Sequence, residues 1–262
     1  MNLYSLPPIA AALDGAYSVV TALASLLNPL FGDAAAALIV VLVTLLVRAA
    51  LIPVGVSRVR AELTRRRLTP QLAELTRKYG KNRELLQRKT RELYAREKAS
   101  PVAGCLPTLV QLPVVSTVYG LFSLAMINGH SNLLLVQQLA GVNLGTSLLA
   151  LLGSGGAWPG GLMFLALLGV IGGVTWLSRR MAVAEARTAG ASVPPRTAGP
   201  AVPAAGVPSP TGMLSWLPFI TVGVAAIVPL AAALYLTVST SWTLIERIVV
   251  RRILDPGLAA AQ

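Results

Sequence analysis

Residues 34–56 read AAAALIVVLVTLLVRAALIPVGV, an apolar run in which Arg48 is the only charged side chain. As a helix, the part from Ala34 to Pro53 spans about 30 Å, the thickness of the hydrocarbon core of a bilayer. An arginine near the centre of such a helix costs about 2.5–3.5 kcal/mol to insert. The stretch therefore predicts a transmembrane helix whose arginine needs a compensating environment.

Two environments would satisfy Arg48. Its side chain could snorkel to the nearer membrane surface, which Arg58 and Arg60 mark. Alternatively, it faces a water-filled cavity inside the protein, where Thr44, one turn earlier on the same face, hydrates it or hydrogen-bonds beside it. Side chains lean toward the N-terminus of their helix, so an outside-to-inside helix aims Arg48 away from the cytosolic surface. We therefore favour the internal cavity.

The composition indicates a polytopic membrane protein, because 55% of the 262 residues are hydrophobic, 12% are charged and the mean hydropathy is +0.69. A single cysteine, Cys105, and a single histidine, His130, leave little material for a metal site. No Gly-x-x-x-x-Gly-Lys loop is present, which argues against an ATP-driven mechanism. We expect no catalytic residues, no metal and no cofactor, and we expect that the protein is not an enzyme.

The basic residues mark the side of the membrane on which each segment lies. Residues 57–100 hold fourteen Lys and Arg and five acids, a net charge of +9, whereas 1–47, 101–178 and 197–246 hold no Lys or Arg. Since basic loops stay in the cytoplasm, this segment is cytoplasmic and the N-terminus lies outside. Its bases could face solvent only, or dock on anionic lipid head groups, ribosomal RNA or nascent chains.

Two helices are predicted within this basic segment. The first begins with Thr69 as N-cap and Pro70 in the first turn, and ends at Gly80. The second runs from about Asn82 to Lys98. A short turn between them predicts an antiparallel helical hairpin.

The number of membrane crossings follows from the side of the membrane on which the basic residues must lie. Residues 133–152 are long enough to cross, but a crossing there would place Arg179 and Arg180 outside, against the positive-inside rule. The uncharged stretch 212–245 is too long for one crossing, and Pro229 divides it into two spans that return the C-terminus to the cytoplasm.

The predicted fold class is all-α: a multi-pass cell-membrane protein with five transmembrane helices around a cytoplasm-open hydrophilic groove, and a cytoplasmic antiparallel helical hairpin. In chain order, the predicted segments are an external interfacial helix (1–33), the first span (34–56), the basic hairpin (57–100), the second span (101–127), an external or re-entrant segment (128–161), the third span (162–178), a flexible cytoplasmic linker (179–212), the fourth span (213–228), the fifth span (229–248) and a cytoplasmic tail (249–262).

Polar side chains on three predicted spans supply the candidate groove. The last span carries Tyr235, Ser239, Trp242 and Glu246 at i, i+4, i+7 and i+11, which is one side of a helix. Trp242 could instead be an ordinary interfacial aromatic. The predicted substrate-groove residues are Arg48, Thr44, Gln111, Tyr119, Tyr235, Ser239 and Trp242.

The chain carries the motifs Thr44-Leu-Leu-Val-Arg48, Leu51-Ile-Pro53, Thr69-Pro70-Gln71-Leu72, Lys78-Tyr79, Ser100-Pro-Val-Ala-Gly-Cys-Leu-Pro107, Leu109-Val-Gln-Leu-Pro113, Leu217-Pro218, Pro229-Leu230 and Leu234-Tyr235. In their order and spacing these motifs resemble the YidC/Oxa/Alb membrane-protein insertases, in the five-span form of Gram-positive, actinobacterial-like members. The resemblance is strong over residues 30–125 and weaker over 213–252. Leu236 and the residue after Pro229 depart from the usual pattern, as do residues 128–160.

The resemblance implies an insertase that acts without Sec or alongside it. It implies that the hairpin captures substrate, that Arg48 is the groove arginine, that Thr44 and Tyr235 meet the substrate's transmembrane segment, and that Gln111 belongs to the motif of the second span. Nascent membrane proteins are the implied partners, with the Sec translocon and the ribosome beside them, and DNA is not one. Two alternatives stay open: a small anion-selective transporter or channel, and a non-catalytic membrane assembly factor.

Overall fold

The computed structural model describes residues 7–97, 99, 106–127, 129–155, 158–191 and 219–254. The chain forms two compact units. Unit 1 comprises Met1–Ile52, Val110–Trp176 and Pro218–Glu246, and unit 2 comprises Pro53–Leu109, Leu177–Leu217 and Arg247–Gln262. The predicted pieces at 101–105, 192–218 and 255–262 lie outside the described residues.

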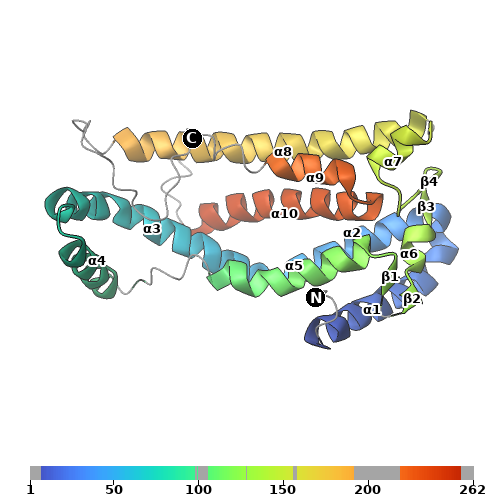
Figure 1. Cartoon of the computed structure of the whole chain (residues 1–262), viewed down its shortest axis with the longest axis horizontal. Helices are drawn as coiled ribbons and strands as arrows, with labels where there is room; N and C mark the ends of the chain where they lie inside the picture. The colour runs from blue at the N-terminus through green and yellow to red at the C-terminus, as the bar shows by residue number, and fades with distance from the viewer. Residues whose placement is uncertain are drawn as a thin grey trace. The chain divides into compact units, whose positions relative to one another are not determined.

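Helices dominate the described chain, with two small β-hairpins among them (Figure 1). The elements are α1 (Pro7–Phe31), the 3-10 helix η2 (Gly32–Ala34), α2 (Ala35–Ala50), α3 (Ile52–Tyr79), α4 (Arg83–Arg96), α5 (Leu106–Ser123), β1 (Met126–Ile127), β2 (His130–Ser131), α6 (Leu133–Val136), β3 (Gln138–Leu139), β4 (Val142–Asn143), α7 (Leu148–Gly153), α8 (Trp158–Ala191), α9 (Ile220–Ile227) and α10 (Leu230–Leu254).

Among the described residues of unit 1, most helices contribute to one hydrophobic core. Ile39 of α2, Phe122 of α5 and Phe164 of α8 are fully buried in it. The first turn of α10 adds Leu230 and the alanines 231–233, which are also buried. Because alanine has no side chain beyond Cβ, these positions let neighbouring backbones approach closely, as small residues do between membrane helices.

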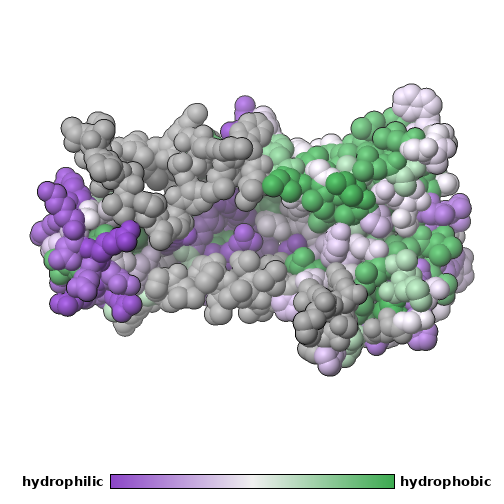
Figure 2. Space-filling view, in the orientation of Figure 1, coloured by the Kyte–Doolittle hydropathy of each residue, from purple (hydrophilic) through white to green (hydrophobic). Residues whose placement is uncertain are grey.

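Among the residues that the structure describes, two stretches of helix are long and apolar enough to cross a bilayer: Ile9–Ala50, and Gly160–Ala184 within α8. Large apolar side chains on them, such as Leu46 and Leu165, are exposed. Figure 2 shows the matching hydrophobic surface over α8 and α9. An exposed apolar surface of this extent is expected of helices that face lipid.

The apolar run that opens the sequence is divided between two helices. α2 ends at Ala50, before the predicted end of the first span at Val56, and α3 begins at Ile52. Proline clashes with the carbonyl four residues earlier and disfavours helical geometry in the residue before it. Pro53 accounts for the break, because its ring would meet the carbonyl of Ala49 in a continuous helix.

The segment predicted as external or re-entrant, 128–161, forms short elements between α5 and α8. It contains β2, α6, β3, β4 and α7; β2 pairs antiparallel with β1, which lies just before the segment, and β3 pairs antiparallel with β4. The backbone carbonyls of Leu144 and Thr146 accept hydrogen bonds from the N–H groups of Ala231 and Leu230, both at 2.9 Å. This segment therefore satisfies N–H groups in the first turn of α10, which the helix itself leaves unpaired. Its side of the membrane stays a prediction.

Asn132 ties the same segment to the end of α5. Its side chain is 1% exposed, and its Nδ2 donates to the carbonyls of Leu121 at 2.7 Å and Leu124 at 3.0 Å. Its Oδ1 accepts from the N–H of Leu134 at 3.3 Å. The carbonyls at a helix C-terminus lack intrahelical donors, so this asparagine supplies them.

We expect Asn132→Ala to destabilise unit 1 by about 2–3 kcal/mol, because it leaves buried carbonyls without a donor. Thermal unfolding in detergent, followed by circular dichroism, would measure the loss. Asn143→Ala is the matched control, since the side chain of Asn143 is exposed. Equal stability of the two variants would contradict this role for Asn132.

In unit 2 the predicted start of a helix at Thr69 and Pro70 is wrong. α3 runs through both residues to Tyr79, and Pro70 lies inside it. The Thr69 hydroxyl donates to the carbonyl of Arg65 at 2.9 Å, within its own helix, so it does not act as an N-cap. Thr69 and Pro70 are both exposed, so a proline is tolerated on this face of α3.

The second helix of the basic segment begins as the sequence indicates. The Asn82 side chain accepts from the N–H of Leu85 at 3.1 Å, the geometry of an N-cap, and α4 follows to Arg96. Arg67 of α3 forms an ion pair with Glu97 at the end of α4, at 2.5 Å. α3 and α4 thus form a helical hairpin that turns at residues 80–82 (Figure 1).

The later predicted segments differ from the helices in their bounds. The third span, 162–178, lies within α8, which continues to Ala191 and so makes the first part of the predicted linker helical. The described part of the fourth span, 213–228, contains α9. The fifth span, 229–248, lies in α10, which continues into the predicted tail as far as Leu254.

Candidate functional site

A hydrogen bond joins two helices of unit 1 at Arg48, the arginine that the sequence singles out. The Nε of Arg48, in the last turn of α2, donates to the Oγ of Ser239 on α10 at 3.2 Å. Ser239 is 3% exposed, and Arg48 is half-buried. A guanidinium has five N–H donors in a fixed plane, so a bond at Nε sets its orientation.

Thr44 lies one turn before Arg48 and is 1% exposed. Its hydroxyl donates to the carbonyl of Val40 at 2.6 Å. This bond uses the only hydrogen that the hydroxyl has to donate, so toward a neighbour Thr44 can act only as an acceptor.

The aromatic residues of the predicted groove contribute to the core of unit 1. Tyr235 is 5% exposed, and its ring packs against that of Phe122 on α5, with centroids 5.9 Å apart and planes tilted by 44°. Tyr119, one turn before Phe122, is half-buried against the same core. Offset, tilted aromatic pairs of this kind stabilise packing by about 0.5–1.5 kcal/mol beyond the area that they bury.

Trp242 and Glu246 continue the line of Tyr235 and Ser239 along α10. Both residues are half-buried. The indole Nε1 of Trp242 is buried and has no hydrogen-bond partner among the described residues. A buried N–H without an acceptor is costly, and it can be satisfied by a ligand or by water.

The structure thus brings Arg48 and Ser239 into direct contact and places Tyr235 against α5. Gln111 lies in α5, but its side chain is not among those that the structure describes. The roles of all seven predicted groove residues in binding a substrate stay predictions.

A cluster of charged residues in unit 2 was missed by the sequence reasoning. The Oε1 of Glu62, on α3, accepts from Arg247 at 2.8 Å and Arg251 at 2.7 Å, both on α10, and lies 3.4 Å from Arg66. Burial raises the pKa of Glu62, but the charges and hydrogen bonds of Arg247 and Arg251 outweigh it and hold this pKa at about 2. The sequence did indicate that Glu62 and Arg66 lie on one face of a helix, and likewise Arg247 and Arg251, because each pair is four residues apart. It did not indicate that the two faces meet.

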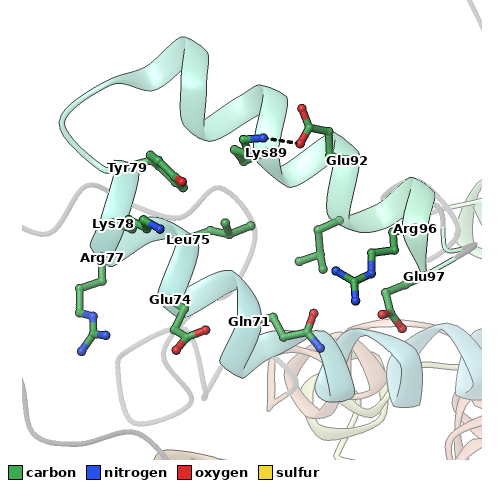
Figure 3. Close-up of a pocket in the computed structure, with 11 residues that line it drawn as sticks. Gln71, Glu74, Leu75, Arg77, Lys78, Tyr79, Lys89, Glu92, Arg96 and Glu97 are labelled. Atoms are coloured by element: carbon green, nitrogen blue, oxygen red, sulfur yellow. Dashed lines mark hydrogen bonds and ion pairs between the residues drawn. The ribbon is translucent and has the colours of Figure 1, made fainter.

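The hairpin of unit 2 encloses an open cleft of about 810 Å³ between the end of α3 and α4 (Figure 3). Leu75 points from α3 toward α4, with charged residues around it. Lys89 and Glu92 form an ion pair at 2.6 Å on the rim, and the ammonium of Lys78 lies 5.5 Å from the centre of the Tyr79 ring. The cleft therefore offers a small apolar floor within a charged rim.

The described residues contain no group of three or more His, Cys, Asp or Glu side chains that could hold a metal ion. The candidate sites are therefore sites for binding through charge, hydrogen bonds and apolar contact.

Apolar helices of bilayer length with exposed leucines, and the half-buried Arg48 in the first of them, are the features of a helical membrane protein. The family model described as "60Kd inner membrane protein" matches residues 26–256. The chain belongs to this family, the YidC/Oxa/Alb family.

Relatives named "Membrane protein insertase YidC" align with parts of the chain. The one from Fusobacterium nucleatum is 33% identical over 95 residues, 36% of this chain and 46% of the relative. Those from Clostridium perfringens and Vesicomyosocius okutanii are 35% and 40% identical over 95 and 80 residues, which are 36% and 30% of this chain and 40% and 15% of the relatives. Each alignment covers less than half of the relative's length.

Proposed function

We propose that this protein is a membrane-protein insertase. It takes hydrophobic segments of newly made proteins from the cytoplasm through a hydrophilic groove into the bilayer, without Sec or alongside it. The groove lies among five spans, with the N-terminus outside and the C-terminus in the cytoplasm. Membership of the YidC/Oxa/Alb family and the insertase names of the aligned relatives support this function.

The observation that carries the proposal is the contact between Arg48 and Ser239. It keeps a guanidinium half-buried in a unit built from apolar helices. A permanent positive charge in such surroundings attracts acidic or polar segments of a passing chain, and its field is stronger there than in bulk water. Arg48, Thr44, Gln111, Tyr119, Tyr235, Ser239 and Trp242 line this groove in the proposal, and Trp242 offers a donor to the substrate backbone.

The hairpin formed by α3 and α4 is the proposed capture element. Figure 2 shows a strongly hydrophilic surface over α4, in keeping with the charge of +9 in residues 57–100. Its bases would hold the hairpin near anionic lipid head groups, while the cleft around Leu75 offers apolar contact to an incoming segment. The ribosome and the Sec translocon are further proposed partners.

The proposed cycle involves no covalent chemistry. The energy comes from partition of the hydrophobic segment into lipid, and from the membrane potential acting on charges that the substrate carries, at about 2.3 kcal/mol per charge per 100 mV.

Reconstitution of the purified protein in liposomes tests this function. We expect a substrate with one transmembrane segment to reach a protease-protected, membrane-spanning state faster than in empty liposomes. Liposomes that contain an unrelated multi-pass protein control for bilayer defects. Insertion at the rate of the empty liposomes would rule the function out.

A further inference from the structure

The six-residue helix α7 is apolar both where it meets the core of unit 1 and where it is exposed. Leu148 and Leu151 pack against the core. Leu149 and Leu152, on the exposed side, are 57% and 66% exposed. A helix that faces water on one side carries polar residues there, whereas a helix that is hydrophobic all round is enclosed by protein or by lipid. The described part of the chain covers one side of α7 only, so the exposed leucines need a second apolar neighbour.

A close contact places α7 beside the first turn of α8 in unit 1. A Cβ added at Gly160 would lie 3.0 Å from Cδ2 of Leu151 and 2.5 Å from Cγ2 of Val142, so both side chains lie directly against the α8 backbone. Gly160 is also the first residue of the stretch Gly160–Ala184, which is long and apolar enough to cross a bilayer. α7 therefore lies level with one end of that stretch (Figure 1).

Trp158 marks the same level on α8. It is the first residue of α8 and is 78% exposed. An exposed indole at the end of a membrane-length helix is typical of the head-group region, where its apolar ring and its polar N–H both find partners. The next exposed leucines on α8 are Leu162 and Leu165, which lie within the stretch of bilayer length. α7 thus lies where the head-group region would meet this apolar surface.

Serine side chains satisfy part of the backbone hydrogen bonding at both ends of α7. The Oγ of Ser147 accepts from the N–H of Ala150 at 3.3 Å, and the N–H of Ser154 donates to the carbonyl of Ala150 at 3.1 Å. The Ser154 hydroxyl donates to the carbonyl of Leu151 at 3.0 Å. At the edge of the hydrocarbon region, backbone groups without a protein partner are costly. These local bonds therefore suit a short helix at that depth.

The charge pattern favours lipid as the second neighbour of α7. No Asp, Glu, Lys or Arg occurs from residue 99 to residue 178, a range that includes all of α7 and the apolar part of α8. An interface with a soluble protein has a polar rim that stays in contact with water. Here the exposed surface instead continues from Leu149 and Leu152 to the exposed leucines of α8, which are expected to face lipid.

We propose that α7 is an interfacial helix, which lies at the membrane surface with Leu149 and Leu152 inserted among lipid acyl chains. Interfacial helices bury their apolar face about 5–10 Å into the boundary between head groups and acyl chains. This position gives each side of α7 an apolar neighbour, the core of unit 1 on one side and lipid on the other. The inference goes beyond the proposed function and does not depend on it.

The test uses the full chain in liposomes of phosphatidylcholine and phosphatidylglycerol. Cys105→Ser removes the only cysteine of the sequence, and a single new cysteine at Leu149 or Leu152 carries the fluorescent dye NBD. Both side chains are exposed, so the label requires no repacking of the core. We expect lipids with a nitroxide near the head group to quench both probes at least about threefold more than a probe at Glu84, an exposed charged position on α4. Aqueous iodide, present on both sides of the membrane, should show the opposite order.

Leu165→Cys provides the lipid reference, because Leu165 is exposed on the apolar part of α8. A second measurement avoids the dye and uses a polar maleimide present on both sides of the membrane. It should react with Leu149→Cys and Leu152→Cys at least about tenfold more slowly than with Glu84→Cys, because formation of the reactive thiolate is suppressed outside water.

The proposal is overturned if iodide quenches the probes at Leu149 and Leu152 as strongly as the probe at Glu84, since water would then cover this side of α7. It is also overturned if neither the nitroxide lipid nor iodide reaches them, an outcome that assigns the exposed side to another protein surface, such as a second copy of this chain. Quenching by the nitroxide lipid at the level of the Leu165 probe supports it. Failure of the same liposomes to insert a substrate would contradict the proposed function alone.

Discussion

Arg48→Ala will slow the insertion of substrates with an acidic translocated segment by about tenfold, and that of neutral substrates by no more than about twofold. At an effective dielectric constant of about 20, a charge pair some 6 Å apart contributes about 3 kcal/mol, and solvent in the proposed groove would screen part of this. About 1.4 kcal/mol then remains, which is a factor of ten in rate. The measurement is the insertion rate in liposomes of two substrates that differ only in the charge of the translocated segment.

Two further variants separate charge from geometry in that measurement. Ser239→Ala keeps the charge but removes the acceptor at 3.2 Å, so it should reduce the preference for acidic substrates by less than Arg48→Ala does. Arg58→Ala removes an exposed charge from the following helix and should change neither substrate class. Equal slowing of acidic and neutral substrates by Arg48→Ala would remove the electrostatic role of Arg48.

Acidification will loosen the attachment of α3 to the end of α10 through Glu62. Because the pKa of Glu62 falls from 4.5 to about 2 on folding, its contribution to stability is complete above 4.5 and is lost as the pH drops toward about 2. Charged hydrogen bonds contribute about 1.5–3 kcal/mol when well shielded, and a third of the Glu62 side chain is exposed, so we expect about 1–2 kcal/mol.

Glu62→Gln measures that contribution directly. At neutral pH the variant should unfold about 1–2 kcal/mol more easily than wild type in a denaturant titration, and the difference should vanish as the pH approaches about 2. Glu74→Gln, an exposed acid on the same helix, is the control. A constant difference between wild type and Glu62→Gln across this pH range would show that the carboxylate charge is not what joins the helices.

Features that depend on one helix could be predicted from the sequence, and the family follows from motifs that lie within single segments. The periodic polar line on α10 and the isolated Arg48 predicted a site on these helices, and Arg48 and Ser239 are in contact. The start of the second helix at about Asn82 was likewise predicted, and the structure adds that the Asn82 side chain caps this helix, an interaction over three residues.

The features that the sequence could not supply depend on contacts between distant segments. Asn132 is a polar residue in an apolar stretch, and only the packed end of α5 gives its side chain two acceptors. The Glu62 cluster requires residues 185 and 189 positions apart to meet. The Thr69-Pro70 start was wrong for a local reason, because a threonine hydroxyl can bond either forward as a cap or back to its own helix.

The β-bridge between Ser147 and Pro229 brings together the two ends of the chain segment that contains α7, α8 and α9. The N–H groups of Ala231 and Leu230, after this segment, donate hydrogen bonds to the carbonyls of Leu144 and Thr146, before it. The entropy of closing a loop rises only slowly with its length, by about 0.6 kcal/mol per doubling. Insertions or deletions between α8 and α9 should therefore leave the contact of Arg48 on α2 with Ser239 on α10 unchanged. Evolution can thus alter the length of this segment independently of that contact.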